Sequence, residues 1–159
     1  MTWAEVCEDP RLNRLPYRIE TDRWGNLVMS PPPRSRHAEY QTEIAYLLRT
    51  LLQNGRSITE CPLETREGVK AMDAAWVSQE RRKSKPNDPA YLIAPEICVE
   101  VLSPSNSPGE IEEKKQLYFE KGALEFWICD QHGNMSFFDP SGPIPSSKLC
   151  PDFPPKVEV

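Results

Sequence analysis

The stretch ICVEVL, Ile97–Leu102, constrains the fold more than any other part of the sequence. It is short, rich in β-branched residues and almost wholly apolar, which is typical of a strand covered on both faces. We therefore expect it to be a central strand of a sheet that carries helices.

Two amphipathic helices are expected to cover that sheet. The first begins near Ser35 and ends before Asn54-Gly55, with apolar residues at helical spacing at Tyr40, Ile44, Leu47, Leu48 and Leu51. The second runs from Pro108 to Lys121, because Ser107 and Glu110 form a capping box with proline at the first helical position.

The other segments complete a mixed α/β (α+β) pattern. We expect an N-terminal hairpin over 17–30, extended stretches over 57–63 and 68–77, a polar loop over 79–89, a closing hairpin from 124–130 and 134–139, and an irregular tail over 140–155. The 159 residues suit one core of ordinary size. The sequence thus predicts a single domain over residues 1–159, a mixed β-sheet flanked by α-helices.

Composition limits the partners. No apolar run approaches the ~18 residues that a bilayer span requires, and Met1–Cys7 leads directly into Glu8, Asp9 and Pro10, unlike a secretory signal. We expect a soluble, cytoplasmic protein with no membrane partner. The net charge of −5 argues against constitutive coating of nucleic acid but leaves a transient nucleic-acid substrate open.

The sequence also contains local clusters of basic residues and five cysteines. Arg34 and Arg36 precede the first helix, and Arg81, Arg82, Lys83 and Lys85 lie in the polar loop, where solvated charge is at least as good an interpretation as phosphate contact. The five cysteines are far apart and form no CxxC pair, so neither a disulfide framework nor a zinc cluster fits them. Cys98 and Cys129 are expected in the core.

Two acidic residues interrupt apolar surroundings. Glu100 lies within the predicted central strand, and Asp73 lies between Met72 and Ala74. A buried carboxylate is costly unless it is paired or binds a metal, so a structural ion pair with lysine or arginine is the alternative for Glu100. If the two stretches are neighbouring antiparallel strands, Asp73 and Glu100 can share Mg²⁺ or Mn²⁺.

The second helix offers a lysine to this site. At 100° per residue, Lys114 and Lys115 both fall roughly 50° from the centre of an inward face made by Ile111, Leu117, Tyr118 and Phe119. Beside two metal-binding carboxylates, either lysine could orient a water that attacks a phosphate. Either could instead be a snorkelling residue on a solvated flank of the helix. His37, at the edge of the first helix's apolar stripe, is a structural histidine or a substrate contact.

Three segments resemble a known family. TECPLETREGVKAMDAAWVS (59–78), APEICVEVLSPSNS (94–107) and KKQLYFEKGALEFWICD (114–130) are similar to the Uma2 family of restriction-endonuclease-like proteins, a domain of unknown function abundant in cyanobacteria. The likeness runs from the 17–30 hairpin to the proline-rich tail and is most specific at Glu100–Ser105, with Asp73 upstream and Tyr118 downstream.

The resemblance implies a PD-(D/E)xK nuclease fold with metal ligands at Asp73 and Glu100. In that superfamily the lysine usually follows the second acid by two residues, a position held here by Leu102. The Uma2 pattern resembles branches in which the lysine has moved to the following helix, which matches Lys114. Met72 stands where the family commonly has proline, a change in a turn more than in a ligand.

Two functions from different classes follow. The first is a metal-dependent endonuclease that hydrolyses DNA phosphodiester bonds, with Asp73 and Glu100 binding Mg²⁺ or Mn²⁺ and Lys114 positioning water. His37, Lys115 and Tyr118 would contact substrate or support these groups, and double-strand cleavage would favour a two-fold homodimer. The alternative is a non-catalytic nucleic-acid- or protein-binding module that retains the nuclease fold.

Overall fold

The fold is built on a six-stranded mixed sheet. The computed structural model describes residues 1–83 and 89–159, and the elements in chain order are α1 (Trp3–Glu8), β1 (Arg18–Thr21), β2 (Leu27–Ser30), α2 (Ser35–Leu51), β3 (Gly55–Thr65), β4 (Gly68–Ser78), α3 (Gln79–Lys83), β5 (Ile97–Val101), α4 (Pro108–Glu120), β6 (Glu125–Cys129), β7 (Met135–Asp139) and β8 (Gly142–Ile144). Strands β3 to β8 are neighbours in sequence order. Among these described strands only β5 and β6 pair in parallel, so the predicted mixed sheet is confirmed.

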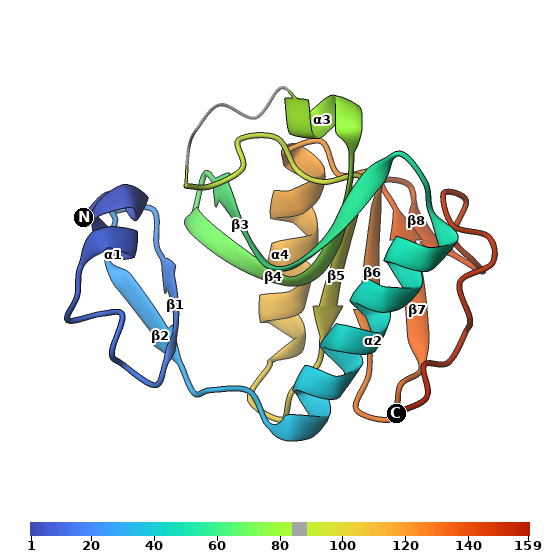
Figure 1. Ribbon diagram of the computed structural model, residues 1–159, viewed down its shortest axis with the longest axis horizontal. Helices are drawn as coiled ribbons and strands as arrows, with labels where there is room; N and C mark the ends of the chain where they lie inside the picture. The colour runs from blue at the N-terminus through green and yellow to red at the C-terminus, as the bar shows by residue number, and fades with distance from the viewer. Residues whose placement is uncertain (84–88) are drawn as a thin grey trace.

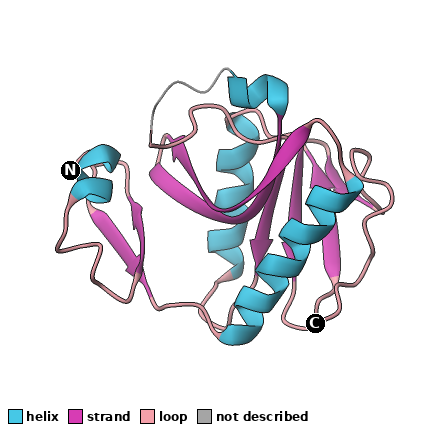
Figure 2. Ribbon diagram, viewed as in Figure 1, coloured by secondary structure: helices cyan, strands magenta, loops and turns pink. Residues whose placement is uncertain are grey.

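Helices α2 and α4 cover opposite faces of this sheet (Figures 1 and 2). Tyr40, Ile44 and Leu48 of α2 belong to one core cluster, together with Val99 and Val101 of β5. The second cluster, on the side of α4, has as its members Ile111, Leu117, Tyr118, Cys98 and Phe126. All five residues of β5 are buried, as predicted for a central strand covered on both faces.

The predicted N-terminal hairpin forms a separate two-stranded sheet. Strands β1 and β2 pair antiparallel from Arg18↔Ser30 to Thr21↔Leu27. Side chains of β1 attach the hairpin to β4: the Thr21 hydroxyl accepts from the backbone N–H of Val69 at 2.8 Å, and Glu20 accepts from that of Ala71 at 2.7 Å. Figure 1 shows the hairpin beside the β3–β4 end of the main sheet.

Three short elements were not predicted. Helix α1 begins at a capping box in which Thr2 and Glu5 bond each other's backbone N–H groups. Helix α3 occupies the start of the predicted polar loop, where the Ser78 hydroxyl accepts from the N–H of Arg81. Residues 84–88 of that loop, with Lys85, lie outside the described residues. Strand β8 replaces part of the predicted irregular tail and pairs with β7.

Burial confirms the interpretation of the cysteines. Cys98 and Cys129 have no exposed surface, and each belongs to one of the two core clusters. In residues 1–83 and 89–159, no helix combines the length and the apolar character that a membrane span needs.

Candidate active site

The candidate site lies where strands β4 and β5 separate. Their antiparallel pairing runs from Trp76↔Ile97 to Ala74↔Val99. The next residues on the two strands are Asp73 and Glu100, and the pairing ends before them. The two stretches are thus neighbouring antiparallel strands, the condition under which the sequence allowed a shared site, and the two acids stand where the strands separate.

The Asp73 carboxylate accepts a backbone hydrogen bond of β5 beyond the point where the pairing of β4 with β5 ends. Its Oδ2 accepts from the backbone N–H of Val101 at 2.6 Å, and its Oδ1 accepts from Arg18 Nη1 at 2.8 Å. His37 Nε2 lies 3.5 Å from Oδ2. Burial alone would raise the pKa of Asp73, but the contact with His37 and the charge of Arg18 outweigh it and hold that pKa well below its ordinary value. Asp73 is thus ionised.

A backbone irregularity interrupts the side-chain alternation of β4 at Asp73, which stays buried. On β4, Met72 packs on the α4 side, whereas the regular alternation that follows puts Ala74 on the α2 side and Ala75 back on the α4 side. Opposite it on β3, Glu60 has a left-handed φ of 52°, a conformation that costs a non-glycine residue about 1 kcal/mol or more. Gln41 Nε2 donates to both the Asp73 carbonyl and Glu60 Oε1, which holds the irregular pair together.

Glu100 is the second buried acid, and its electrostatic state is opposite to that of Asp73. The residue is 2% exposed, and its Oε1 accepts from the Tyr118 hydroxyl at 2.6 Å. Burial, aided by the negative charge of Asp73, raises its pKa to about 8, although Lys114, Arg18 and Tyr118 oppose the change. The adjacent acids therefore have pKa values displaced in opposite directions, a pattern common at functional sites.

Helix α4 brings Lys114 and Tyr118 to Glu100, while Lys115 points elsewhere. Lys114 is 7% exposed, and its Nζ lies 3.9 Å from Glu100 Oε1 and 3.3 Å from Glu20 Oε2. Burial would lower the pKa of Lys114, but the charges of Glu100 and Glu20 outweigh it and raise that pKa. Lys115 pairs with Glu112 at 2.8 Å and lies 4.5 Å above the ring of Phe138.

Of the residues proposed from the sequence, the structure thus brings five together and leaves Lys115 outside. His37 joins the site from the first turn of α2, with Nε2 3.1 Å from the Val101 carbonyl. Its contact with Asp73 raises the pKa of His37. Its Nδ1 is buried and has no hydrogen-bond partner among the described residues.

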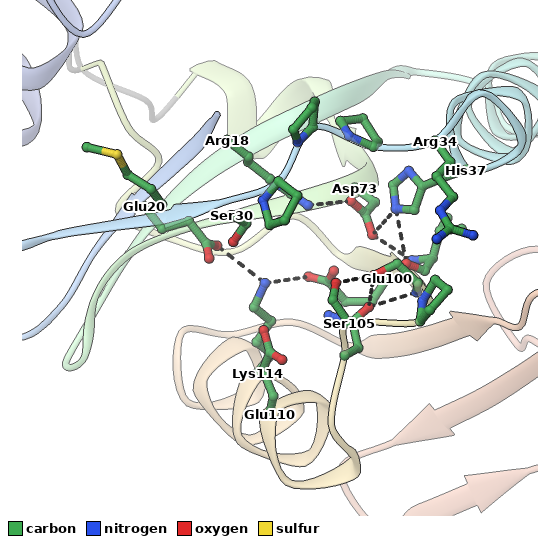
Figure 3. A pocket seen from close by; sticks show the side chains of 18 residues that line it. Arg18, Glu20, Ser30, Arg34, His37, Asp73, Glu100, Ser105, Glu110 and Lys114 are labelled. Carbon is green, nitrogen blue, oxygen red and sulfur yellow. Dashed lines mark hydrogen bonds and ion pairs between the residues drawn. The ribbon is translucent and has the colours of Figure 1, made fainter. Parts of the chain in front are cut away.

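Sequence reasoning missed Arg18 and Glu20, which reach the site from β1. Figure 3 shows Arg18 directed at Asp73 and Glu20 directed at Lys114. The two residues flank Ile19, so they share one face of the strand. That alternation of charged and apolar residues was visible in the sequence, but it also fits a hairpin that faces solvent.

A cavity of about 420 Å³ is lined by Arg18, Glu20, His37, Asp73, Glu100 and Lys114. Its walls include the Pro31–Pro33 segment, which connects the hairpin to α2, and the β5–α4 loop with Ser103 and Ser105. A second cavity of about 280 Å³ shares Arg34 and His37 with the first. The titratable residues that line the second cavity are all basic or aromatic: Arg34, Arg36, His37, Tyr40 and His132.

The other predicted basic cluster has a structural contact. Arg81 Nη1 donates to the carbonyls of Ala94 at 2.6 Å and Gly122 at 2.8 Å. This arginine therefore joins α3 to the segment that precedes β5 and to the turn that follows α4, which accounts for its position without a phosphate ligand.

The donor chemistry of the site fits a hard divalent cation. Two carboxylates on adjacent strands are suitable ligands for Mg²⁺ or Mn²⁺, which typically use one or two carboxylates and keep several waters. The described residues contain no group of three or more His, Cys, Asp or Glu side chains arranged to hold a metal, so water and substrate would complete the coordination. Burial raises the pKa of Glu100 despite the nearby charges of Lys114 and Arg18, so a cation that binds there would displace the proton.

Comparison with solved structures identifies the class of fold. The chain is similar to a crystal structure from Anabaena variabilis ATCC 29413 described as "a putative nuclease belonging to DUF820", with a TM-score of 0.75, 16% sequence identity, and coverage of 96% of this chain and 93% of that chain. The mixed sheet with flanking helices is thus a restriction-endonuclease-like fold.

The family follows from the sequence match. The family model described as "Uma2: Putative restriction endonuclease" matches residues 9–140, so the chain belongs to the Uma2 family, as the motifs predicted. No curated protein matches the chain significantly.

Proposed function

We propose that the protein is a metal-dependent endonuclease that hydrolyses DNA phosphodiester bonds. One observation carries this proposal: two buried acids, Asp73 and Glu100, meet where β4 and β5 separate, with the buried amine of Lys114 beside Glu100 at one cavity. Membership of the Uma2 family supports the nuclease class.

Each residue has a distinct proposed role. Asp73 and Glu100 would hold Mg²⁺ or Mn²⁺, which supplies Lewis-acid activation and charge neutralisation when bound. Lys114 would orient the attacking water and stabilise negative charge on the phosphate. Tyr118 would hold the orientation of Glu100 through its 2.6 Å hydrogen bond. His37 would hold the Asp73 carboxylate in position, since its Nε2 lies 3.1 Å from the Val101 carbonyl and 3.5 Å from Asp73 Oδ2.

Two arginines beside the cavity support a polyanionic substrate. The overall charge is −5, yet Arg34 stands at the junction of the two cavities and Arg36 lines the second. A DNA strand whose scissile phosphate enters the first cavity would place a neighbouring phosphate near these arginines. The acidic remainder of the surface then favours transient binding.

A second function has one specific observation in its favour. Arg18 and the Val101 N–H already occupy both Asp73 oxygens, as expected of a structural ion pair in a non-catalytic nucleic-acid- or protein-binding module. The enzyme remains preferred because structural ion pairs give no reason for two buried acids and the amine of Lys114 to line the same cavity.

A plasmid assay separates the two functions. Purified protein is incubated with supercoiled plasmid and Mn²⁺ or Mg²⁺, beside Asp73→Asn and the surface control Arg66→Gln. We expect nicking by the wild type and Arg66→Gln, and none by Asp73→Asn. Binding of DNA without cleavage in either metal would instead support the non-catalytic module. Direct conversion to linear plasmid would support a two-fold homodimer.

A further inference from the structure

The N-terminal hairpin introduces one positive and one negative side chain among the proposed catalytic groups. Arg18 contacts Asp73, and Glu20 contacts Lys114 at 3.3 Å. Both come from β1, which belongs to the separate two-stranded sheet (Figures 1 and 3). The charge state of the site therefore depends on a segment outside the six-stranded sheet.

The guanidinium of Arg18 lies against a proposed metal ligand. Its Nη1 is 2.8 Å from Asp73 Oδ1, its Nη2 donates to the Ala71 carbonyl, and its side chain is 19% exposed. Arginine keeps its charge at every accessible pH. A divalent cation at Asp73 would thus meet a positive charge within a few Å, in a setting where water screens it poorly.

The hairpin has anchors that do not depend on Arg18. Glu20 accepts from the Ala71 N–H at 2.7 Å, and Thr21 accepts from the Val69 N–H at 2.8 Å and from Lys70 Nζ at 3.1 Å. These bonds would keep β1 attached to β4 if the long side chain of Arg18 changed its rotamer.

The Glu60 carboxylate is a second anion that the Arg18 guanidinium can bind, away from the proposed metal position. Glu60 Oε2 lies 3.1 Å from Arg18 Nε, and the Glu60 side chain is 46% exposed, in contrast to Asp73. A guanidinium that leaves Asp73 would keep an ion pair with Glu60 and gain water. The movement would give up the Arg18 bonds to Asp73 and to the Ala71 carbonyl and would leave the Glu20 and Thr21 anchors in place.

We propose that Arg18 is a built-in cation that competes with a divalent metal for Asp73, so that metal binding requires its guanidinium to move toward Glu60. The proposal rests on the metal-dependent function proposed above and adds its regulation: Arg18 sets the metal concentration at which the site becomes occupied.

The test measures Mn²⁺ affinity directly by calorimetry, independent of cleavage. Removal of the charge in Arg18→Gln should tighten Mn²⁺ binding by at least about tenfold, a conservative figure for a unit charge within a few Å at an effective dielectric constant of about 20. Arg18→Lys keeps the charge and should stay within about threefold of the wild type, and Arg66→Gln controls for loss of a surface arginine. Asp73→Asn in the Arg18→Gln background should abolish the gain.

Equal Mn²⁺ affinity in wild type and Arg18→Gln would overturn the competition and leave the proposed function intact. Absence of Mn²⁺ binding in both would overturn the proposed function as well. If Arg18→Gln fails to fold, the test uses the wild type. The NMR signal of Arg18 Nε is assigned by its absence in Arg18→Lys. This signal should shift during a Mg²⁺ titration, with the same midpoint as Mg²⁺ binding measured by calorimetry. An unmoved signal at saturating Mg²⁺ would contradict the proposal.

Discussion

The raised pKa of Glu100 makes stability without metal depend on pH in a definite direction. The folded protein binds this proton with a pKa of about 8, against an ordinary value of 4.5. Between those limits the folded state holds more protons than the unfolded state, so the free energy of unfolding falls as pH rises. The slope approaches about 1.4 kcal/mol per pH unit, which gives a total on the order of a few kcal/mol.

The other site residues do not cancel this effect. Asp73 has a depressed pKa, so its contribution is lost only as pH falls below its ordinary value of 3.8. The pKa of His37 is raised from 6.5, so its stabilising contribution is present below 6.5 and is lost as pH rises through the folded value, with the same sign as Glu100. The pKa of Lys114 is raised from 10.5, above the window.

The assay is urea unfolding in EDTA between about pH 5 and 8, where the midpoint and slope give the free energy. Glu100→Gln keeps an acceptor for Tyr118 but cannot titrate. We expect the wild type to lose stability across this range, and the variant to lose much less, so that the variant becomes the more stable of the two near pH 8. Parallel curves for the two proteins would refute a protonated Glu100 in the folded state.

Three further outcomes are expected. Lys114→Met should lower single-turnover cleavage at saturating Mn²⁺ by about two to three orders of magnitude, whereas Lys115→Met should lose less than about tenfold; the reverse ranking would show that the other lysine acts. Tyr118→Phe should cost about 1–3 kcal/mol in urea unfolding, because it removes a buried donor from Glu100, and a change within error would contradict that role. Mn²⁺ binding near pH 7 should release protons, seen by calorimetry in buffers of different ionisation enthalpy, and the release should vanish in Glu100→Gln.

The sequence predicted the parts of the fold that local periodicity determines. Helices α2 and α4 and strand β5 follow from apolar spacing and caps, and Asp73 and Glu100 stood out as charges in apolar runs. The short elements were harder, because α1 is six residues long and its Thr2–Glu5 capping box precedes no periodic apolar run.

The sequence did not reveal the parts of the site that depend on contacts between segments far apart in the chain. Nothing near Arg18 reveals that its strand meets β4 some 55 residues later. Tertiary packing also distinguishes Lys114 from Lys115. The Lys115 amine lies over the ring of Phe138 on β7, whereas the Lys114 amine lies beside Glu100 on β5. Helical angle alone treats the two positions as equivalent.

The separation of the β1–β2 hairpin from the six-stranded sheet has an evolutionary consequence. The large sheet supplies Asp73 and Glu100 at the point where β4 and β5 separate, a geometry that many core contacts maintain. The hairpin supplies Arg18 and Glu20 on a strand of four residues. Substitution of Arg18 could change the charge of the cavity while the Glu20 and Thr21 anchors stay in place, so variation in a small appendage could diversify function across descendants that share one unchanged scaffold.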